Sequence, residues 1–287
     1  MDNNYFFSLI DLNQNTIVSK CVKRGQGPNE VFGMPTPITI VDKNNFCFYD
    51  PNKRKVFNVN FSNNKDPHIS QNNKFKTKTR SMDLLQILNG KFVAIGLFDK
   101  GRYLVMDSLG NELSYNFDYP VIKNETQLSN AHKAMAFQGV FKRKPTGDKL
   151  VFAAQTSQLI EILQIDIRGE MKMKFQWHGV FGKYTPYGDG KKDTSAAISN
   201  ESSVEFLNTY ATNDYIYLLY SGRIIGNDIV NAYKAKTIFV IDWDGHPVMR
   251  YNLDIDVKYF AVSDDDKILY AIAEQDDTNL VKFKIDH

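Results

Sequence analysis

Short runs of alternating apolar and polar residues, separated by turns rich in Gly, Asn and Asp, follow one another along the whole chain. Alternation with a period of two is typical of β-strands that bury one face, and such turns connect strands into tight hairpins. One hairpin pattern recurs four times, as an apolar strand ending at or near Asp, a polar turn and an alternating strand. It reads YFFSLIDLNQNTIVSKCV from Tyr5, YLVMDSLGNELSYNF from Tyr103, EILQIDIRGEMKMKFQW from Glu161 and TIFVIDWDGHPVMRYNL from Thr237.

A second type of hairpin usually precedes the first. It reads ITIVDKNNFCFY from Ile38, LLQILNGKFVAIGL from Leu84, FKRKPTGDKLVFAAQ from Phe141, FLNTYATNDYIYLLY from Phe206 and YFAVSDDDKILYAIA from Tyr259. Two hairpins make a unit of four strands, A to D, that repeats about every 40–50 residues, which is the signature of a β-propeller. The sequence therefore predicts an all-β fold, with residues 1–287 forming a single propeller domain of four-stranded antiparallel blades.

The number of blades follows from the A strands. Five are visible, beginning near Ile38, Met82, Ala134, Phe206 and Val257, while the chain before Ile38 supplies only a C–D pair. The pattern favours six blades with an incomplete first blade, and a ring closed by joining the terminal strands in one blade is the alternative. We expect no helix, because no segment combines a sustained helical period with caps.

Composition narrows the class of protein. Apolar residues make up 43% and charged residues 24% of the chain, as in ordinary folded domains, and 13% are aromatic, which favours strands. The formal net charge of +2 gives no indication of nucleic-acid binding, and no apolar run is long enough to span a bilayer. No CxxC or Cys/His cluster indicates a structural zinc site, and Cys21 and Cys47 are expected to be buried thiols rather than a disulfide.

Two segments resemble a known family. LIDLNQNTIVSKCVKRGQGPNEV, with its GxGPxE core, and FYDPNKRKVFNV are similar to the TolB-like six-bladed β-propeller proteins. The resemblance implies a bacterial protein of exported or lipid-anchored type, in the periplasm or at the cell surface, with no established activity and no catalytic residues. Family members usually have an A–B hairpin before the segment that matches Tyr5–Leu12, so the chain is expected to be shortened, and a removed export signal fits that expectation. A cytoplasmic location stays open.

Propeller connectivity predicts which face carries function. Strands alternate in direction, so the A–B and C–D turns lie on one face and the B–C and D–A connections lie on the other. The first set is short, whereas the second includes the long segments 23–37, 120–133, 178–204 and 221–236. Long loops on a rigid scaffold are where binding usually resides. We therefore expect a functional site on the D–A/B–C face, near the central channel.

Candidate binding residues come from those long segments. In KRGQGPNEVF the glycines and proline suit a chain that turns a corner, and a structural role is favoured over ligand contact. Aromatic residues on the Gly-rich segment 178–204 are able to stack on a sugar or peptide, and an Arg that ends a B strand is able to hold a carboxylate or phosphate. A structural role or a solvated position is the alternative for each. The candidates are Arg24, Gln26, Asn29, Glu30, His132, Phe181, Tyr184, Tyr187 and Arg223.

Two functions stay open. The favoured one is a non-catalytic protein that binds a protein, a peptide or a glycan, because no catalytic motif is present, no catalytic residue is assigned and no cofactor is required. The alternative is a calcium-dependent propeller hydrolase or lactonase with an axial metal, which needs ligands from several blades such as Glu30, Asn124, Glu125 and His132. Asp264–Asp266 lacks the spacing of a calcium loop and reads as a turn. The oligomeric state is not indicated.

Overall fold

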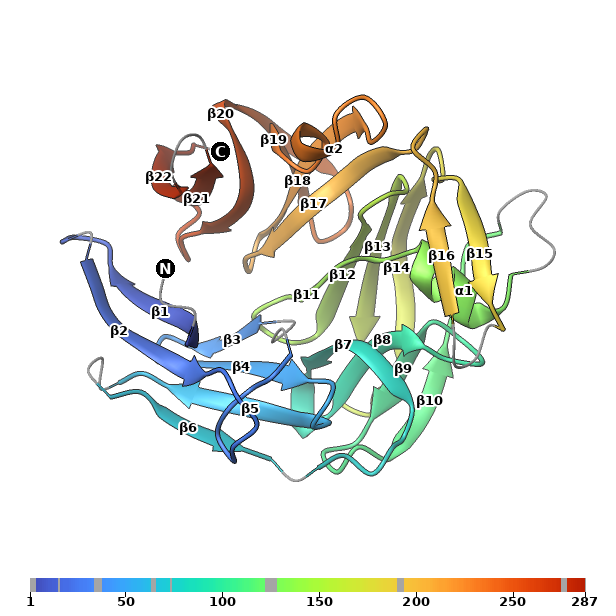
Figure 1. Ribbon diagram of the computed structural model, residues 1–287, viewed down its shortest axis with the longest axis horizontal. Coiled ribbons are helices and arrows are strands. Elements are labelled where there is room, and N and C mark those ends of the chain that lie inside the picture. The colour runs from blue at the N-terminus through green and yellow to red at the C-terminus, as the bar shows by residue number, and fades with distance from the viewer. Residues whose placement is uncertain are drawn as a thin grey trace.

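Antiparallel sheets stand in a ring around a common axis, as the repeating hairpins predict (Figure 1). The computed structural model describes residues 4–14, 16–33, 38–62, 66–72, 74–121, 128–189, 194–274 and 278–286. Each sheet presents its first strand to the centre and its last strand to the rim, which is the arrangement of a β-propeller. The predicted fold class is confirmed.

Three blades are four-stranded sheets of consecutive strands. Blade 2 is β3 (Ile38–Asp42), β4 (Asn45–Asp50), β5 (Lys55–Asn60) and β6 (His68–Gln71). Blade 3 is β7 (Arg80–Gln86), β8 (Phe92–Leu97), β9 (Tyr103–Met106) and β10 (Glu112–Asn116), with a 3-10 turn at Leu88–Gly90. Blade 4 is β11 (Gly139–Arg143), β12 (Lys149–Ala154), β13 (Leu159–Ile165) and β14 (Met171–His178).

Blades 5 and 6 share one long strand. Blade 5 is β17 (Ser203–Ala211), β18 (Tyr215–Ile224), β19 (Ala235–Asp242) and the first part of β20 (Pro247–Val262), and blade 6 is the end of β20, β21 (Ile268–Glu274) and β22 (Thr278–Lys284). Met249 of β20 pairs with Val240 of β19, whereas Phe260 of β20 pairs with Ala271 of β21. The D strand of one blade thus runs directly into the A strand of the next.

The N-terminal hairpin occupies the sixth position of the ring. It consists of β1 (Tyr5–Asp11) and β2 (Thr16–Lys23), and Figure 1 shows it between the blade of β3–β6 and the strands β21 and β22. Within the described residues, no backbone pairing joins β22 to β1. The chain therefore has the predicted incomplete first blade, a C–D pair alone.

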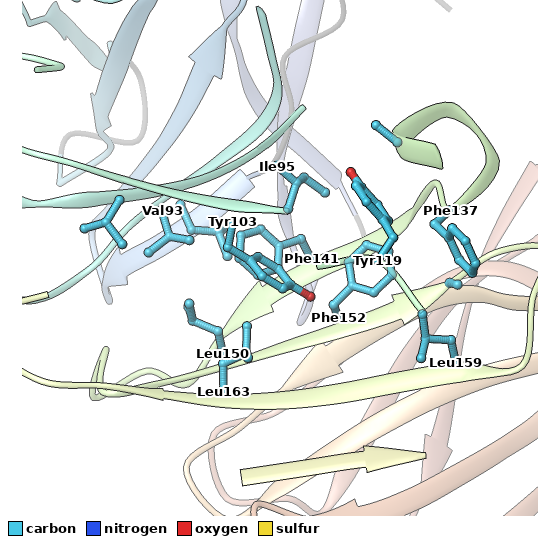
Figure 2. Packing of buried hydrophobic residues seen from close by; sticks show 14 of the residues in the cluster. Val93, Ile95, Tyr103, Tyr119, Phe137, Phe141, Leu150, Phe152, Leu159 and Leu163 are labelled. Atoms are coloured by element: carbon cyan, nitrogen blue, oxygen red, sulfur yellow. The ribbon is translucent and has the colours of Figure 1, made fainter. Parts of the chain in front are cut away.

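Apolar packing lies between neighbouring blades rather than in one central core. The largest cluster joins blades 3 and 4, with Val93 and Tyr103 from one blade and Leu150, Phe152 and Leu163 from the other (Figure 2). Along β12, Leu150 and Phe152 face blade 3 while the alternate residues of the strand face blade 5. Second strands such as β4 and β12 are buried on both faces for this reason, and their sequences read as nearly continuous apolar runs.

Two short helices and one extra hairpin depart from the sequence prediction. Helix α1 (Asn130–Ala136) lies in the D–A connection between blades 3 and 4, so the strand expected from Ala134 begins at Gly139 instead. Helix α2 (Ile229–Ala232) lies in the B–C loop of blade 5. The segment between blades 4 and 5 forms a hairpin of β15 (Tyr184–Gly188) and β16 (Thr194–Ile198). One turn or two of helix leaves no periodic signal in the sequence.

Cys21 and Cys47 are free thiols buried in the clusters on either side of blade 2, as the sequence predicts. Burial raises the pKa of each thiol to about 11. Across the described part of the chain, no helix has the length and apolar character needed to cross a membrane.

Candidate functional site

The GxGPxE segment folds into a corner held by its own backbone and side chains. The amide of Gly25 donates to the carbonyl of Val31 at 3.0 Å, and the carboxylate of Glu30 accepts from the amide of Gly27 at 3.0 Å. Lys53 Nζ donates to the carbonyl oxygens of Gly27 and Glu30, each at 2.6 Å. These contacts fasten the connection after β2 to the hairpin turn of blade 2.

The other candidates in this loop lie on its outer side. The guanidinium of Arg24 lies 4.0 Å from the ring centroid of Phe6, a cation–π contact. The side-chain oxygen of Asn29 accepts from the amide of Gln71 at 3.3 Å. Gln26 is exposed, and no ion pair joins Arg24 to Glu30, both of which are described. The loop thus offers exposed polar groups, and Gly27, Asn29 and Glu30 also border a surface pocket of about 530 Å³.

Four further candidates meet at α1 and the β15–β16 hairpin. His132 is buried, and its Nε2 lies 3.0 Å from the carbonyl oxygen of Tyr187. Phe181 packs edge-on against Phe137 with a centroid separation of 5.5 Å. The hydroxyl groups of Tyr184 and Thr156 are 2.7 Å apart. Three of these candidates hold the hairpin against blade 4, while the side chain of Tyr187 is 59% exposed and free to meet a partner.

Arg223 lies in a separate place, on blade 5. Its Nη2 contacts both carboxylate oxygens of Asp256, at 2.7 and 3.0 Å. Its Nη1 donates to the carbonyl oxygens of Asn231 and Lys234. The side chain therefore ties α2 to β19 and β20, and its donors are already engaged.

A pocket that the sequence did not single out lies on the predicted face, between blades 3 and 4. It has a volume of about 260 Å³. The pocket is surrounded by residues at the start of A strands, at the end of a B strand and just before a C strand. It therefore opens among the D–A and B–C connections. The lining comprises Met82, Asp83, Ile95, Gly96, Arg102, Tyr119, Ala134, Phe137, Gln138, Gly139 and Phe152. Figure 2 shows Tyr119, Phe137 and Phe152 close together at this position.

Arg102 is the charged group of this pocket and is only 1% exposed. Its Nη1 lies 2.7 Å from Oε2 of Glu161, which is also 1% exposed. The contact is an ion pair in which the N–H bonds are not directed at the oxygen, because neither Nη1 nor Nη2 makes a hydrogen bond of good geometry within the described residues. The guanidinium also lies 4.3 Å from the ring centroid of Phe152 and 5.2 Å from that of Tyr119.

The surroundings keep the guanidinium of Arg102 charged. Burial by itself lowers the pKa of Arg102, but its interactions with Tyr103 and Glu161 outweigh burial and raise the pKa above the ordinary value. Glu161 accepts a hydrogen bond from the Tyr103 hydroxyl at 2.5 Å and one from the Gln176 amide at 2.8 Å. Burial raises the pKa of Tyr119 to about 12, so its hydroxyl is neutral and able to donate. The pocket thus combines aromatic walls with hydrogen-bond donors.

Sequence reasoning missed this site for a clear reason. Arg102 lies in the B–C turn DKGRY, where a charged residue is ordinary. Glu161 carried a signal, because it is the one charged residue in the apolar strand LIEILQI. A carboxylate at a position that faces a neighbouring blade needs a buried partner.

The ligand set of the calcium alternative is not brought together by the described residues. Glu30 and His132 serve the loops in which they lie, far apart in the chain and on different blades. Asn124 and Glu125 lie outside the described residues. Among the residues that the structure does describe, there is no group of three or more His, Cys, Asp and Glu side chains able to hold a metal ion.

Comparison with known proteins identifies the family to which the chain belongs. The model of the family described as TolB-like 6-blade propeller-like matches residues 1–265. The chain belongs to the TolB-like six-bladed propeller family, as its GxGPxE segment indicated. No curated protein matches it.

Several solved structures are similar to this chain at low sequence identity, and one of them has a TM-score above 0.5. A member of the DUF4221 family from Bacteroides vulgatus is similar with a TM-score of 0.54 and 10% identity, covering 96% of this chain and 85% of that chain. A candidate exported protein of Bacteroides fragilis has a TM-score of 0.47 and 13% identity, covering 91% and 72%. Virginiamycin B lyase of Staphylococcus aureus has a TM-score of 0.42 and 13% identity, covering 88% and 70%. Identities this low extend to the fold and to nothing finer.

Proposed function

We propose that this protein is a non-catalytic binding protein that takes a carboxylate-bearing ligand, such as a peptide or an acidic glycan, in the pocket between blades 3 and 4. The observation that carries the proposal is the buried guanidinium of Arg102, which lines this pocket; its Nη1 is ion-paired with Glu161, but neither Nη1 nor Nη2 makes a hydrogen bond of good geometry within the described residues. The position is on the D–A/B–C face, where long connections were expected to place a site.

Buried donors without an acceptor destabilise the empty pocket. A buried N–H group without an acceptor costs about 1–3 kcal/mol, and more when the group is charged. Cation–π contacts with Phe152 and Tyr119 offset part of this cost but leave the N–H hydrogens unpaired. A ligand oxygen that reaches the guanidinium recovers the rest, and carboxylates do so best because two of their oxygens match the guanidinium fork.

The rest of the lining favours holding a ligand over transforming one. Tyr119, Phe137 and Phe152 supply flat apolar walls, and Gln138 supplies an amide that can accept or donate. Asp83 also lines the pocket and disfavours a second carboxylate beside it. A ligand with one carboxylate and an apolar or aromatic body fits this combination.

We also propose, on family membership alone, that the protein acts in the cell envelope. The calcium-dependent hydrolase or lactonase remains the alternative, and no described group of residues favours it over binding. Thermal unfolding with a chelator and then with added calcium separates the two, since a metal bound to the native state raises the unfolding midpoint. The binding proposal expects no calcium-dependent rise.

The test of the pocket uses benzoate as the probe, with benzylamine as its cationic counterpart. Benzoate is expected to raise the thermal unfolding midpoint of the wild-type chain in a concentration-dependent way, and benzylamine is not. The double variant Arg102→Met/Glu161→Gln removes the donors without leaving an unpaired charge and is expected to lose the benzoate effect. Arg168→Met is the matched control, because the side chain of Arg168 is 70% exposed on blade 4.

Two outcomes contradict the proposal. In one, benzoate raises the midpoint of the double variant as much as that of the wild type, so Arg102 does not hold the carboxylate. In the other, benzoate at millimolar concentration leaves the unfolding midpoints of both the wild type and the Arg168→Met control unchanged, so the pocket does not bind this carboxylate.

A further inference from the structure

A separate cavity lies on the face of the ring opposite the Arg102 pocket, at the mouth of the central channel. Its volume is about 330 Å³. Inner strands from the blades around the ring contribute to it at their A–B ends. The lining comprises Ile38–Lys43 of blade 2, Leu85 of blade 3, Lys142, Arg143 and Pro145 of blade 4, Tyr210–Asn213 of blade 5 and Asp264 of blade 6.

Lys142 is a cationic side chain that lines this cavity. It lies on β11, the inner strand of blade 4, one residue before Arg143 ends the strand. No hydrogen bond or ion pair to its ammonium group is found among the described residues. Burial lowers the pKa of Lys142, and the nearby charge of Asp83 opposes that shift without overcoming it. The side chain is only partly buried, and among the described residues no carboxylate contacts its ammonium group.

Arg143 adds a second cation that is only partly satisfied. Its Nη2 donates to the carbonyl oxygen of Ile40 at 3.1 Å, across the channel mouth from blade 4 to blade 2. Its Nε is buried and has no hydrogen-bond partner among the described residues. Burial also lowers the pKa of Arg143. The exposed side chain of Lys43 adds positive charge at the rim.

The carboxylates of the lining do not neutralise these cations. Asp42 is engaged in its own turn, where its oxygens accept from the amide of Asn44 and the side-chain amide of Asn45, each at 2.8 Å. Asp264 is exposed at the outer rim. Three basic and two acidic side chains line the cavity; Lys142 and Arg143 are partly buried, whereas Lys43, Asp42 and Asp264 are exposed.

We propose that the channel mouth binds a small oxyanion, a carboxylate or a phosphate, with Lys142 as its principal cation. No carboxylate pairs with the Lys142 ammonium group among the described residues, and an anion in the cavity supplies the missing opposite charge. Arg143 lines the same cavity and adds a second positive charge that acts on the anion. This site is separate from the pocket of Arg102 and does not depend on the function proposed for that pocket.

Isothermal titration with inorganic phosphate, at constant ionic strength and neutral pH, tests the proposal. Phosphate is expected to bind the wild type, and Lys142→Met is expected to weaken binding at least tenfold. Lys142→Arg is expected to retain most of the affinity. Lys174→Met, at an exposed position on β14, is expected to bind as the wild type does. A parallel titration with acetate shows whether a carboxylate suffices.

A competitive labelling experiment keeps the test decisive if Lys142→Met fails to fold. Trace acetylation of the wild type by acetic anhydride, read residue by residue with mass spectrometry, is expected to slow at Lys142 when phosphate is present, while Lys174 keeps its rate. The proposal is overturned if phosphate leaves labelling of Lys142 unchanged, or if Lys142→Met binds phosphate as tightly as the wild type.

Discussion

Removing one member of the buried pair Arg102–Glu161 is expected to destabilise the protein more than removing both. Arg102→Met leaves the carboxylate of Glu161, which is 1% exposed, with only the hydroxyl of Tyr103 and the amide of Gln176 as partners. Breaking a buried pair in this way costs about 3–5 kcal/mol of unfolding free energy, because an uncompensated charge remains. Glu161→Gln leaves the guanidinium of Arg102 among aromatic rings and is expected to cost about as much.

The double variant Arg102→Met/Glu161→Gln is expected to lie within about 1–2 kcal/mol of the wild type, because no charge stays buried and Gln still accepts from Tyr103. Equilibrium unfolding in urea, with reversibility checked, measures all four proteins and gives a coupling free energy of at least about 2 kcal/mol. The exposed pair Arg168–Glu170, with side chains 70% and 62% exposed, is the control and is expected to show almost no coupling. If the effects of Arg102→Met and Glu161→Gln simply add, the pair does not act as a buried unit and the reasoning is refuted.

Three further expectations concern positions outside the pocket. Gly25→Ala is expected to cost about 1–3 kcal/mol, because the added Cβ would lie 2.0 Å from Oε2 of Glu30, and an unchanged urea midpoint would contradict this. Cys21 and Cys47 are expected to react with Ellman's reagent at pH 8 far more slowly in the folded chain than in urea, because burial holds each pKa near 11, and equal rates would show that the thiols are accessible. His132→Ala is expected to speed amide hydrogen exchange in the β15–β16 hairpin at least tenfold, whereas exchange no faster than in a variant of an exposed histidine would show that the hairpin does not depend on this contact.

The repeat of paired hairpins in the sequence was enough to predict the blades. Turns such as LNGK and PTGDK mark A–B connections, and alternation along the strands marks which residues face a neighbouring blade. The incomplete first blade followed from the single C–D pair before Ile38. The helix α1 was missed because seven residues capped by Ser129 carry too short a period to stand out from a loop.

The candidate site was predicted less well than the fold. The face was inferred from loop lengths, and the pocket lies on that face. The residues that form it come from two blades and one connection, so their approach depends on how the blades pack and not on any local motif. Arg102 and Glu161 are 59 positions apart in the sequence, and their contact follows only from the ring. Aromatic residues on the long segments, such as Phe181 and Tyr184, were read as possible ligand contacts, yet they also satisfy packing within the loops.

The central claim is that the Arg102 pocket binds a carboxylate. A crystal structure determined from wild-type crystals soaked with benzoate tests it most directly. We expect the benzoate carboxylate to lie between blades 3 and 4, with one oxygen within hydrogen-bonding distance of the Arg102 guanidinium. The benzoate ring is expected to pack against Tyr119, Phe137 or Phe152. Benzoate bound elsewhere, with the guanidinium of Arg102 unchanged and the pocket closed or filled by water, would contradict it.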